Sequence, residues 1–107
     1  MLVELDVFSG RPNPRWQLDE RSGQELRRLQ SRLSVSSVAP AEPPALGYRG
    51  FRYTDGTDSW RAYRGQVRTP HAVLADPSFS IERFLLDRLP DEFVQLRGRI
   101  ASELGSR

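Results

Sequence analysis

Val7-Phe8-Ser9-Gly10-Arg11-Pro12-Asn13-Pro14-Arg15-Trp16 is the stretch around which the rest of the chain is organised. It follows an apolar strand pattern and precedes a helix pattern, which predicts a strand-to-helix loop. Two prolines each fix φ at about −65°, and the residue before a proline is pushed to an extended conformation. Gly10 permits a turn that other residues resist. The stretch therefore predicts a semi-rigid arm that turns at Ser9-Gly10, runs extended to Pro14 and is anchored by Trp16.

Two interpretations of this arm are open. In the first, the prolines wrap the chain around one end of a sheet and the tryptophan fills the core. In the second, the rigid loop holds polar side chains in fixed directions, as a recognition site requires. The candidate binding residues in the arm are Ser9, Arg11, Asn13, Arg15 and Trp16.

The composition limits the chemistry that is available. The 107 residues suit a single domain, 1–107. There is no cysteine, which excludes disulfides, thiolate nucleophiles and zinc-thiolate sites. All 16 basic residues are arginine, which excludes lysine Schiff bases and the phosphate-loop lysine. The formal net charge of +2 is a weak field for capturing nucleic acid.

The same features carry an expectation about location. No signal-peptide pattern precedes Glu4 and Asp6, and no run approaches the ~20 apolar residues of a membrane span. We expect a cytoplasmic protein without a membrane partner. The exclusive use of arginine is typical of a GC-rich bacterial genome.

Hydrophobic periodicity predicts the element order β-α-β-β-(β)-α-α. A connector rich in proline, serine and alanine covers about 34–46, and Asp-Gly turn chemistry joins the two hairpin strands. Either Asp19 or Ser22 fits the N-cap of the first helix, and Asp76 fits that of the second. The predicted elements are strands at 2–8, 47–54 and 60–69, a short strand at 71–74, and helices at 18–33, from 76 to 89, and at 91–104.

These elements predict an α+β fold. We expect a small three- to four-stranded, mostly antiparallel sheet with three helices packed on one face. The predicted hairpin interleaves arginines with aromatic residues on both of its faces, so the sequence leaves open which face is buried. Its candidate binding residues are Arg49, Arg52, Arg61 and Arg64.

The case for an enzyme rests on few residues. The one histidine, His71, could form a nucleophile–base–orienter set with Ser9 and Asp6, but there is no glycine-flanked nucleophile motif. No dinucleotide fingerprint or phosphate loop is present, and we expect neither a cofactor nor a metal site.

The function that the sequence favours is a small non-enzymatic binding or accessory module. Arginine forks, a rigid arm and an open sheet edge suit an acidic or C-terminal segment of a protein or peptide partner. The sheet edge would also allow two copies to pair as a homodimer. One alternative is single-stranded nucleic-acid binding through the arginine and aromatic hairpin. Another is a minor hydrolase-type enzyme that uses Ser9, Asp6 and His71.

Overall fold

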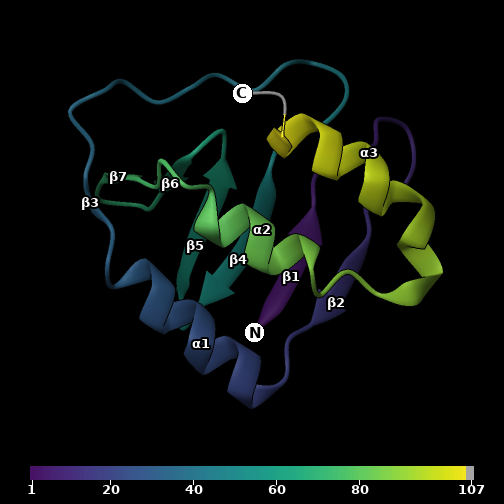
Figure 1. Ribbon diagram of the computed structural model, residues 1–107, viewed down its shortest axis with the longest axis horizontal. Coiled ribbons are helices and arrows are strands. Elements are labelled where there is room, and N and C mark those ends of the chain that lie inside the picture. The colour runs from purple at the N-terminus through teal and green to yellow at the C-terminus, as the bar shows by residue number, and fades with distance from the viewer. Residues whose placement is uncertain (106–107) are drawn as a thin grey trace.

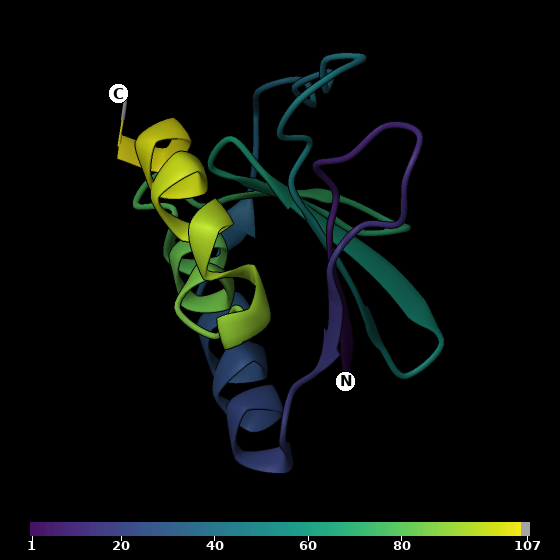
Figure 2. The ribbon, with the colours of Figure 1, turned by 90° about the vertical axis from the view of Figure 1, so that its right-hand side faces the viewer.

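A computed structural model describes residues 1–105 and shows a seven-stranded antiparallel sheet with three α-helices on one face (Figure 1, Figure 2). The strand order in the sheet is β2-β1-β4-β5-β6-β7-β3. The strands are β1 Leu2–Leu5, β2 Arg15–Gln17, β3 Ser34–Val35, β4 Phe51–Asp55, β5 Asp58–Tyr63, β6 Gln66–Arg68 and β7 Val73–Ala75. The helices are α1 Glu20–Gln30, α2 Ser80–Leu86 and α3 Val94–Gly105, the last preceded by a 3-10 turn, η1, at Asp91–Phe93.

The α+β class, the antiparallel sheet and the three helices on one face are confirmed, but the predicted three or four strands are wrong. The predicted strand at 60–69 is two strands, β5 and β6. Arg64 and Gly65 between them have φ of 50° and 75°, so the chain reverses there. An arginine in the left-handed region is uncommon and has no signature in composition. β2 and β3 have only three and two residues, too few to show an alternating pattern.

The stretch from Phe8 to Trp16 is the loop of a hairpin and the start of its second strand, β2, so its prediction as a strand-to-helix loop is wrong. Gly10 turns the chain with φ of 85°, and Trp16 then lies opposite Val3 as β2 pairs with β1. The backbone N–H of Leu5 donates to the carbonyl of Pro14 at 3.0 Å, which closes the loop next to the strands.

The helix starts follow from side-chain capping. Asp19 is the N-cap of α1, because its carboxylate accepts from the backbone N–H of Ser22 at 2.7 Å. The second helix begins at Ser80, four residues later than its predicted N-cap, because Phe79 adopts φ of 59°. Asp76 still caps the start of the helix. Its carboxylate accepts from the backbone N–H groups of Ser80 at 3.1 Å and of Ile81 at 2.9 Å.

The core lies between the sheet and the helix layer. Alternate residues of β1 and β4 supply the sheet side, and one stripe of each helix supplies the other. Trp16 is half-buried and meets the Phe51 ring edge-to-face at 6.5 Å, so it packs on the core. No helix within residues 1–105 has the length and apolar character needed to cross a bilayer. The fully buried core side chains include Val3, Leu5, Phe51, Tyr53, Leu26, Ile81, Leu85 and Ile100.

Candidate functional site

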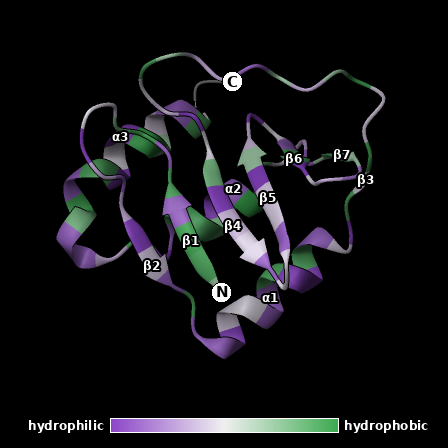
Figure 3. Cartoon of the chain, turned by 180° about the vertical axis from the view of Figure 1, so that it is seen from behind, coloured by the Kyte–Doolittle hydropathy of each residue, from purple (hydrophilic) through white to green (hydrophobic). Residues whose placement is uncertain are grey.

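The face of the sheet that points away from the helices, called the open face here, carries a row of charged side chains. Figure 3 views the sheet from this side. Val3 and Leu5 point into the core, so Glu4 between them points to the open face. Residues directly opposite each other in antiparallel strands share a face. The register therefore places Arg15, Glu4, Arg52, Arg61 and Arg68 side by side across β2, β1, β4, β5 and β6.

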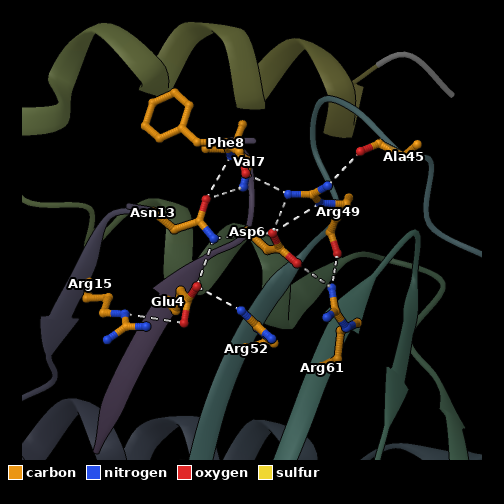
Figure 4. Close-up of polar contacts among 10 residues, drawn as sticks. All are labelled: Glu4, Asp6, Val7, Phe8, Asn13, Arg15, Ala45, Arg49, Arg52 and Arg61. Atoms are coloured by element: carbon orange, nitrogen blue, oxygen red, sulfur yellow. Dashed lines mark hydrogen bonds and ion pairs between the residues drawn. The ribbon is translucent and has the colours of Figure 1, made fainter. Parts of the chain in front are cut away.

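Asp6, just beyond β1, binds two of the hairpin arginines (Figure 4). Its carboxylate accepts from Arg49 Nε and from Arg61 Nη1, each at 3.1 Å, and forms an ion pair with Arg49 Nη2 at 2.9 Å. Arg49 also donates to the carbonyls of Ala45 and Phe8, each at 2.7 Å. The guanidinium of Arg49 thus joins the segment after β1, which contains Asp6 and Phe8, to the connector at Ala45, and its role is structural.

Gly50 makes this arrangement possible. It has φ of 100°, and a Cβ at this position would lie 2.5 Å from the carbonyl oxygen of Ala62. The bend lets the backbone of Asp6 pair with two consecutive residues. Its N–H donates to the carbonyl of Gly50 at 2.9 Å, and its carbonyl accepts from the N–H of Arg49 at 2.8 Å. Only glycine fits such a conformation at such a distance.

Asn13, from the proline-flanked loop, points inward. Its Oδ1 accepts from the backbone N–H groups of Val7 at 3.0 Å and Phe8 at 2.7 Å. Its Nδ2 donates to Glu4 at 2.8 Å and to Asp6 at 3.3 Å. These four bonds use both the acceptor and the donor side of the amide. Asn13 therefore fastens the loop to β1 instead of presenting its amide to a ligand.

Glu4 ties the loop and the hairpin together. Its carboxylate accepts from Arg52 Nη2 at 2.8 Å and pairs with Arg15 Nε at 3.4 Å (Figure 4). Partial burial acts to raise the pKa of Glu4, but the hydrogen bonds from Asn13 and Arg52 and the nearby positive charges outweigh it, so the pKa lies below its ordinary value. The pKa of Asp6 is lowered in the same way: burial opposes the shift, and the bonds from Arg61 and Arg49 dominate.

The lowered pKa values predict a loss of stability in acid. A carboxyl group with a lowered folded-state pKa stabilises the fold above its ordinary pKa, and this contribution disappears as the pH falls through the folded-state value. The ordinary values are 4.5 for Glu4 and 3.8 for Asp6, so the loss starts below about pH 4.5. In urea unfolding at pH 7, 4 and 3, the stability gap between the wild type and Glu4→Gln/Asp6→Asn should shrink as the pH falls. A gap that stays constant would contradict this assignment.

The arginines of the open face divide into an inner and an outer set. The outer three retain donors for an external group, whereas the inner two serve the fold. Nε of Arg52 is buried and has no hydrogen-bond partner among residues 1–105. The exposed side-chain fractions are 21% for Arg49 and 25% for Arg61, against 43% for Arg52, 46% for Arg68 and 64% for Arg15.

Four predicted binding residues lie apart from this network. Ser9 is exposed in the β1–β2 loop. Arg11 stacks its guanidinium 3.8 Å from the centre of the Phe8 ring. Trp16 faces the core. Arg64 lies in the β5–β6 turn and donates to the Tyr63 hydroxyl at 3.1 Å, with electrostatic partners on α2 and α3. The structure brings together the remaining five: Asn13, Arg15, Arg49, Arg52 and Arg61.

Sequence reasoning missed Glu4 and Arg68 as members of the site, and it considered Asp6 only as part of a catalytic set. The alternation of Glu4 and Asp6 with apolar residues in β1 was a usable signal, because it places both on one polar face. Arg68 had no such signal until the turn at Arg64 was known, since that turn brings it opposite Arg61.

The residues of the suggested catalytic set are not brought together. The Asp6 carboxylate is occupied by arginines, and Ser9 lies in the β1–β2 loop. His71 lies in the β6–β7 turn, where its N–H donates to Thr69 Oγ1 at 3.0 Å. β1 and β6 are separated by β4 and β5, which corresponds to three strand spacings or about 14 Å. Within residues 1–105 no group of three or more histidine or acidic side chains is placed to hold a metal ion.

Two shallow hollows lie along the row, one on each side of Arg52. The first, of about 270 Å³, is lined by residues of β1, β2, β4 and β5, among them Glu4 and Arg15. The second, of about 220 Å³, lies over β4, β5 and β6 and is lined by Arg52, Arg61 and Arg68. We call the second one the β4–β6 hollow. Comparison with protein-family models, curated proteins and solved structures finds no match to this chain.

Proposed function

We propose that this chain is a non-enzymatic binding module that recognises an acidic segment of a protein partner on the open face of its sheet. The observation that carries the proposal is the arginine row, in which Arg15, Arg52 and Arg68 retain guanidinium donors. Arginine binds carboxylates through two parallel hydrogen bonds, which gives both affinity and orientation.

The charge of the chain is concentrated on this face. Five guanidinium groups against three carboxylates, Glu4, Asp6 and the exposed Glu42 beside Arg68, leave an excess of two positive charges there. The whole chain has a formal charge of +2, so the remainder is close to neutral. A localised positive patch on a nearly neutral chain attracts acidic surfaces without general adhesion to polyanions.

The bonds that Asp6 and Glu4 form with Asn13 and the arginines, called the inner network here, keep the outer arginines in place. Asp6 holds Arg61 and Arg49, and Glu4 holds Arg52 through one nitrogen only. A guanidinium with one fixed hydrogen bond loses less conformational freedom when it binds a ligand than a free one does. Pre-organisation of this kind favours a recognition surface over ordinary solvated arginines.

The position of the aromatic rings favours a protein partner over single-stranded nucleic acid. Base stacking needs exposed rings beside the basic groups. Four hairpin-region rings, Tyr48, Phe51, Tyr53 and Tyr63, are buried. Among the described residues, Phe8 is a partly exposed ring near the network, and Arg11 covers it. Trp60 lines the β4–β6 hollow, but it packs on the core and its ring stacks on Tyr53. The hollow therefore offers three cationic forks beside one ring that is already stacked.

Pairing of two copies through a sheet edge has less support. The outer strands are β2 and β3, with three and two residues, and short edge strands offer few backbone groups for a second chain. A homodimer therefore is not needed for the proposed binding.

The proposal predicts that Arg52→Ala/Arg68→Ala lowers the affinity for an acidic peptide at least tenfold, because each lost guanidinium contributes about 1 kcal/mol at a partly exposed site. The probe is a fluorescein-labelled peptide of aspartate, glutamate and glycine, followed by fluorescence anisotropy at low and physiological salt. The matched control is Arg21→Ala/Arg28→Ala, which removes the same charge from the exposed side of α1 and should leave the affinity within about twofold. Equal losses in both variants would mean that net charge alone attracts the peptide.

A further inference from the structure

We propose that the β4–β6 hollow binds a phosphate group carried by a serine or threonine of the acidic partner segment. This inference rests on the proposed function and specifies the partner: a phosphorylated acidic peptide. The hollow is a separate subsite of the open face, because its charge, its free donors and its size differ from those of the neighbouring hollow.

The first argument is charge. Arg52 lies directly opposite Arg61, which lies directly opposite Arg68. Like charges in directly opposite positions destabilise a sheet unless an anion compensates them. No carboxylate of the described residues lines this hollow, whereas Glu4 lines the neighbouring one. Asp6 and Glu4 approach the row only from the β1 side. The β4–β6 hollow is thus lined by three arginines and by no carboxylate. The carboxylates that pair with these arginines, Glu4, Asp6 and Glu42, all lie outside its lining.

The second argument is the supply of unused donors. Arg52 donates to Glu4 from Nη2, and its Nη1 forms no hydrogen bond with residues 1–105. Arg61 uses only Nη1, which donates to Asp6 and to the carbonyl of Arg49, so its Nε and Nη2 form no hydrogen bond with residues 1–105. Several N–H groups from three planar forks match the three acceptor oxygens of a phosphate monoester.

A carboxylate is a poorer match, and the chain itself provides the comparison. Glu42, on the connector before β4, approaches Arg68 with its nearest oxygen 3.8 Å from Nη2. Its side chain is 87% exposed, and no hydrogen bond joins the two groups. A single carboxylate within reach of the hollow is therefore not held in it. A phosphate monoester has a charge of about −1.5 to −2 at neutral pH, which neutralises three guanidinium groups more fully than the single negative charge of a carboxylate does.

The size of the hollow argues for one phosphate group on a peptide. At about 220 Å³ it is smaller than the sites of about 300 Å³ or more that enclose whole small-molecule ligands. A nucleotide would leave its base and sugar outside the hollow. The ring that lines the hollow, Trp60, already stacks on Tyr53. A phosphorylated side chain needs only the hollow, while the acidic residues beside it extend toward Arg15.

The test compares two acidic peptides that differ only in a central serine or phosphoserine. With the wild type, phosphorylation is expected to raise the affinity about tenfold. In Arg68→Ala this ratio should fall to about twofold or less, because the outer fork of the hollow is lost. The matched control is Arg15→Ala, because Arg15 lines the neighbouring hollow. This variant should bind both peptides more weakly and leave the ratio of the two affinities near its wild-type value.

The possible outcomes separate the two proposals. If both peptides bind the wild type equally, the phosphate subsite is refuted and the proposed function stands. If neither binds, both are refuted. Inorganic phosphate that competes as well as the phosphopeptide would show that the peptide is not the source of the anion. A thymidine oligonucleotide that binds more tightly than the phosphopeptide would replace the proposed partner by nucleic acid.

Discussion

Replacement of Asp6 by alanine is expected to lower the free energy of unfolding by about 2–3 kcal/mol. The Asp6 side chain is only 10% exposed, and Arg49 and Arg61, at 2.9 and 3.1 Å, are mostly buried beside it. Removing the carboxylate leaves two neighbouring guanidinium groups without their shared anion. It also removes one acceptor of the Asn13 amide, at 3.3 Å. The estimate lies below the value for fully buried pairs because both arginines keep some contact with water.

Urea unfolding at pH 7 measures this loss, with an unchanged denaturant slope as evidence that the folded state is otherwise intact. Asp6→Asn keeps the shape and one acceptor, so its loss should be about half as large. Glu42→Ala is the matched control: it removes an exposed carboxylate that also faces an open-face arginine, and should change stability by less than about 0.5 kcal/mol. If Asp6→Ala and Glu42→Ala are equally mild, the inner network does not hold the fold together.

The alternation in β1 and the turn at Arg64 explain why the sequence predicted the layers of the fold but not the number of strands. Alternation of Val3 and Leu5 with Glu4 and Asp6 is enough to predict one buried and one polar face in β1. The reversal at Arg64 depends on a left-handed backbone in a non-glycine residue. Nothing local in the sequence favours that conformation, and it is fixed by contacts with α2.

Prediction of the site failed at a similar point. Two prolines do set the backbone of the arm, and Gly10 does turn it with φ of 85°. However, φ angles do not decide where a side chain points, and Asn13 turns inward because Glu4, Asp6 and two backbone N–H groups surround it. Gly50 was predictable only as a bulge or a close approach. The role of Gly50 in letting Arg49 reach Asp6 depends on the pairing of β1 with β4. That pairing is a long-range contact, which local sequence does not reveal.

Glu82 on α2 provides the contact that holds the β5–β6 turn. It is almost fully buried, and its Oε1 accepts from the backbone N–H of Gly65 at 2.8 Å. Its Oε2 accepts from the Tyr48 hydroxyl. Burial is the main reason that the pKa of Glu82 is raised, and the bonds from Gly65 and Tyr48 only partly offset it. Folding therefore shifts the equilibrium of Glu82 toward its protonated form relative to the unfolded chain.

Glu82→Ala is expected to destabilise the fold by about 3–4 kcal/mol, because it leaves the Gly65 N–H and the Tyr48 hydroxyl unpaired and opens a cavity under the turn. Glu82→Gln should cost less than about 1 kcal/mol, since its carbonyl can accept from Gly65 while its amide donates to the Tyr48 oxygen. Chemical unfolding measures both. Glu92→Ala, on the exposed surface of η1, is the control and should stay within about 0.5 kcal/mol of the wild type.

The two Glu82 variants also test the sign of its pH dependence. A carboxyl group whose folded-state pKa is raised contributes stability that is fully present below its ordinary pKa of 4.5 and is lost as the pH rises through the folded-state value. Glutamine does not titrate, so the stability of Glu82→Gln relative to the wild type should improve from pH 4 to pH 8. This is opposite to the behaviour expected of Glu4→Gln/Asp6→Asn, whose deficit grows as the pH rises from 3 to 7. A shift of the same sign in both variants would mean that the buried carboxyl is ionised and stabilising, and that the β5–β6 turn is held by charge instead of by neutral hydrogen bonds.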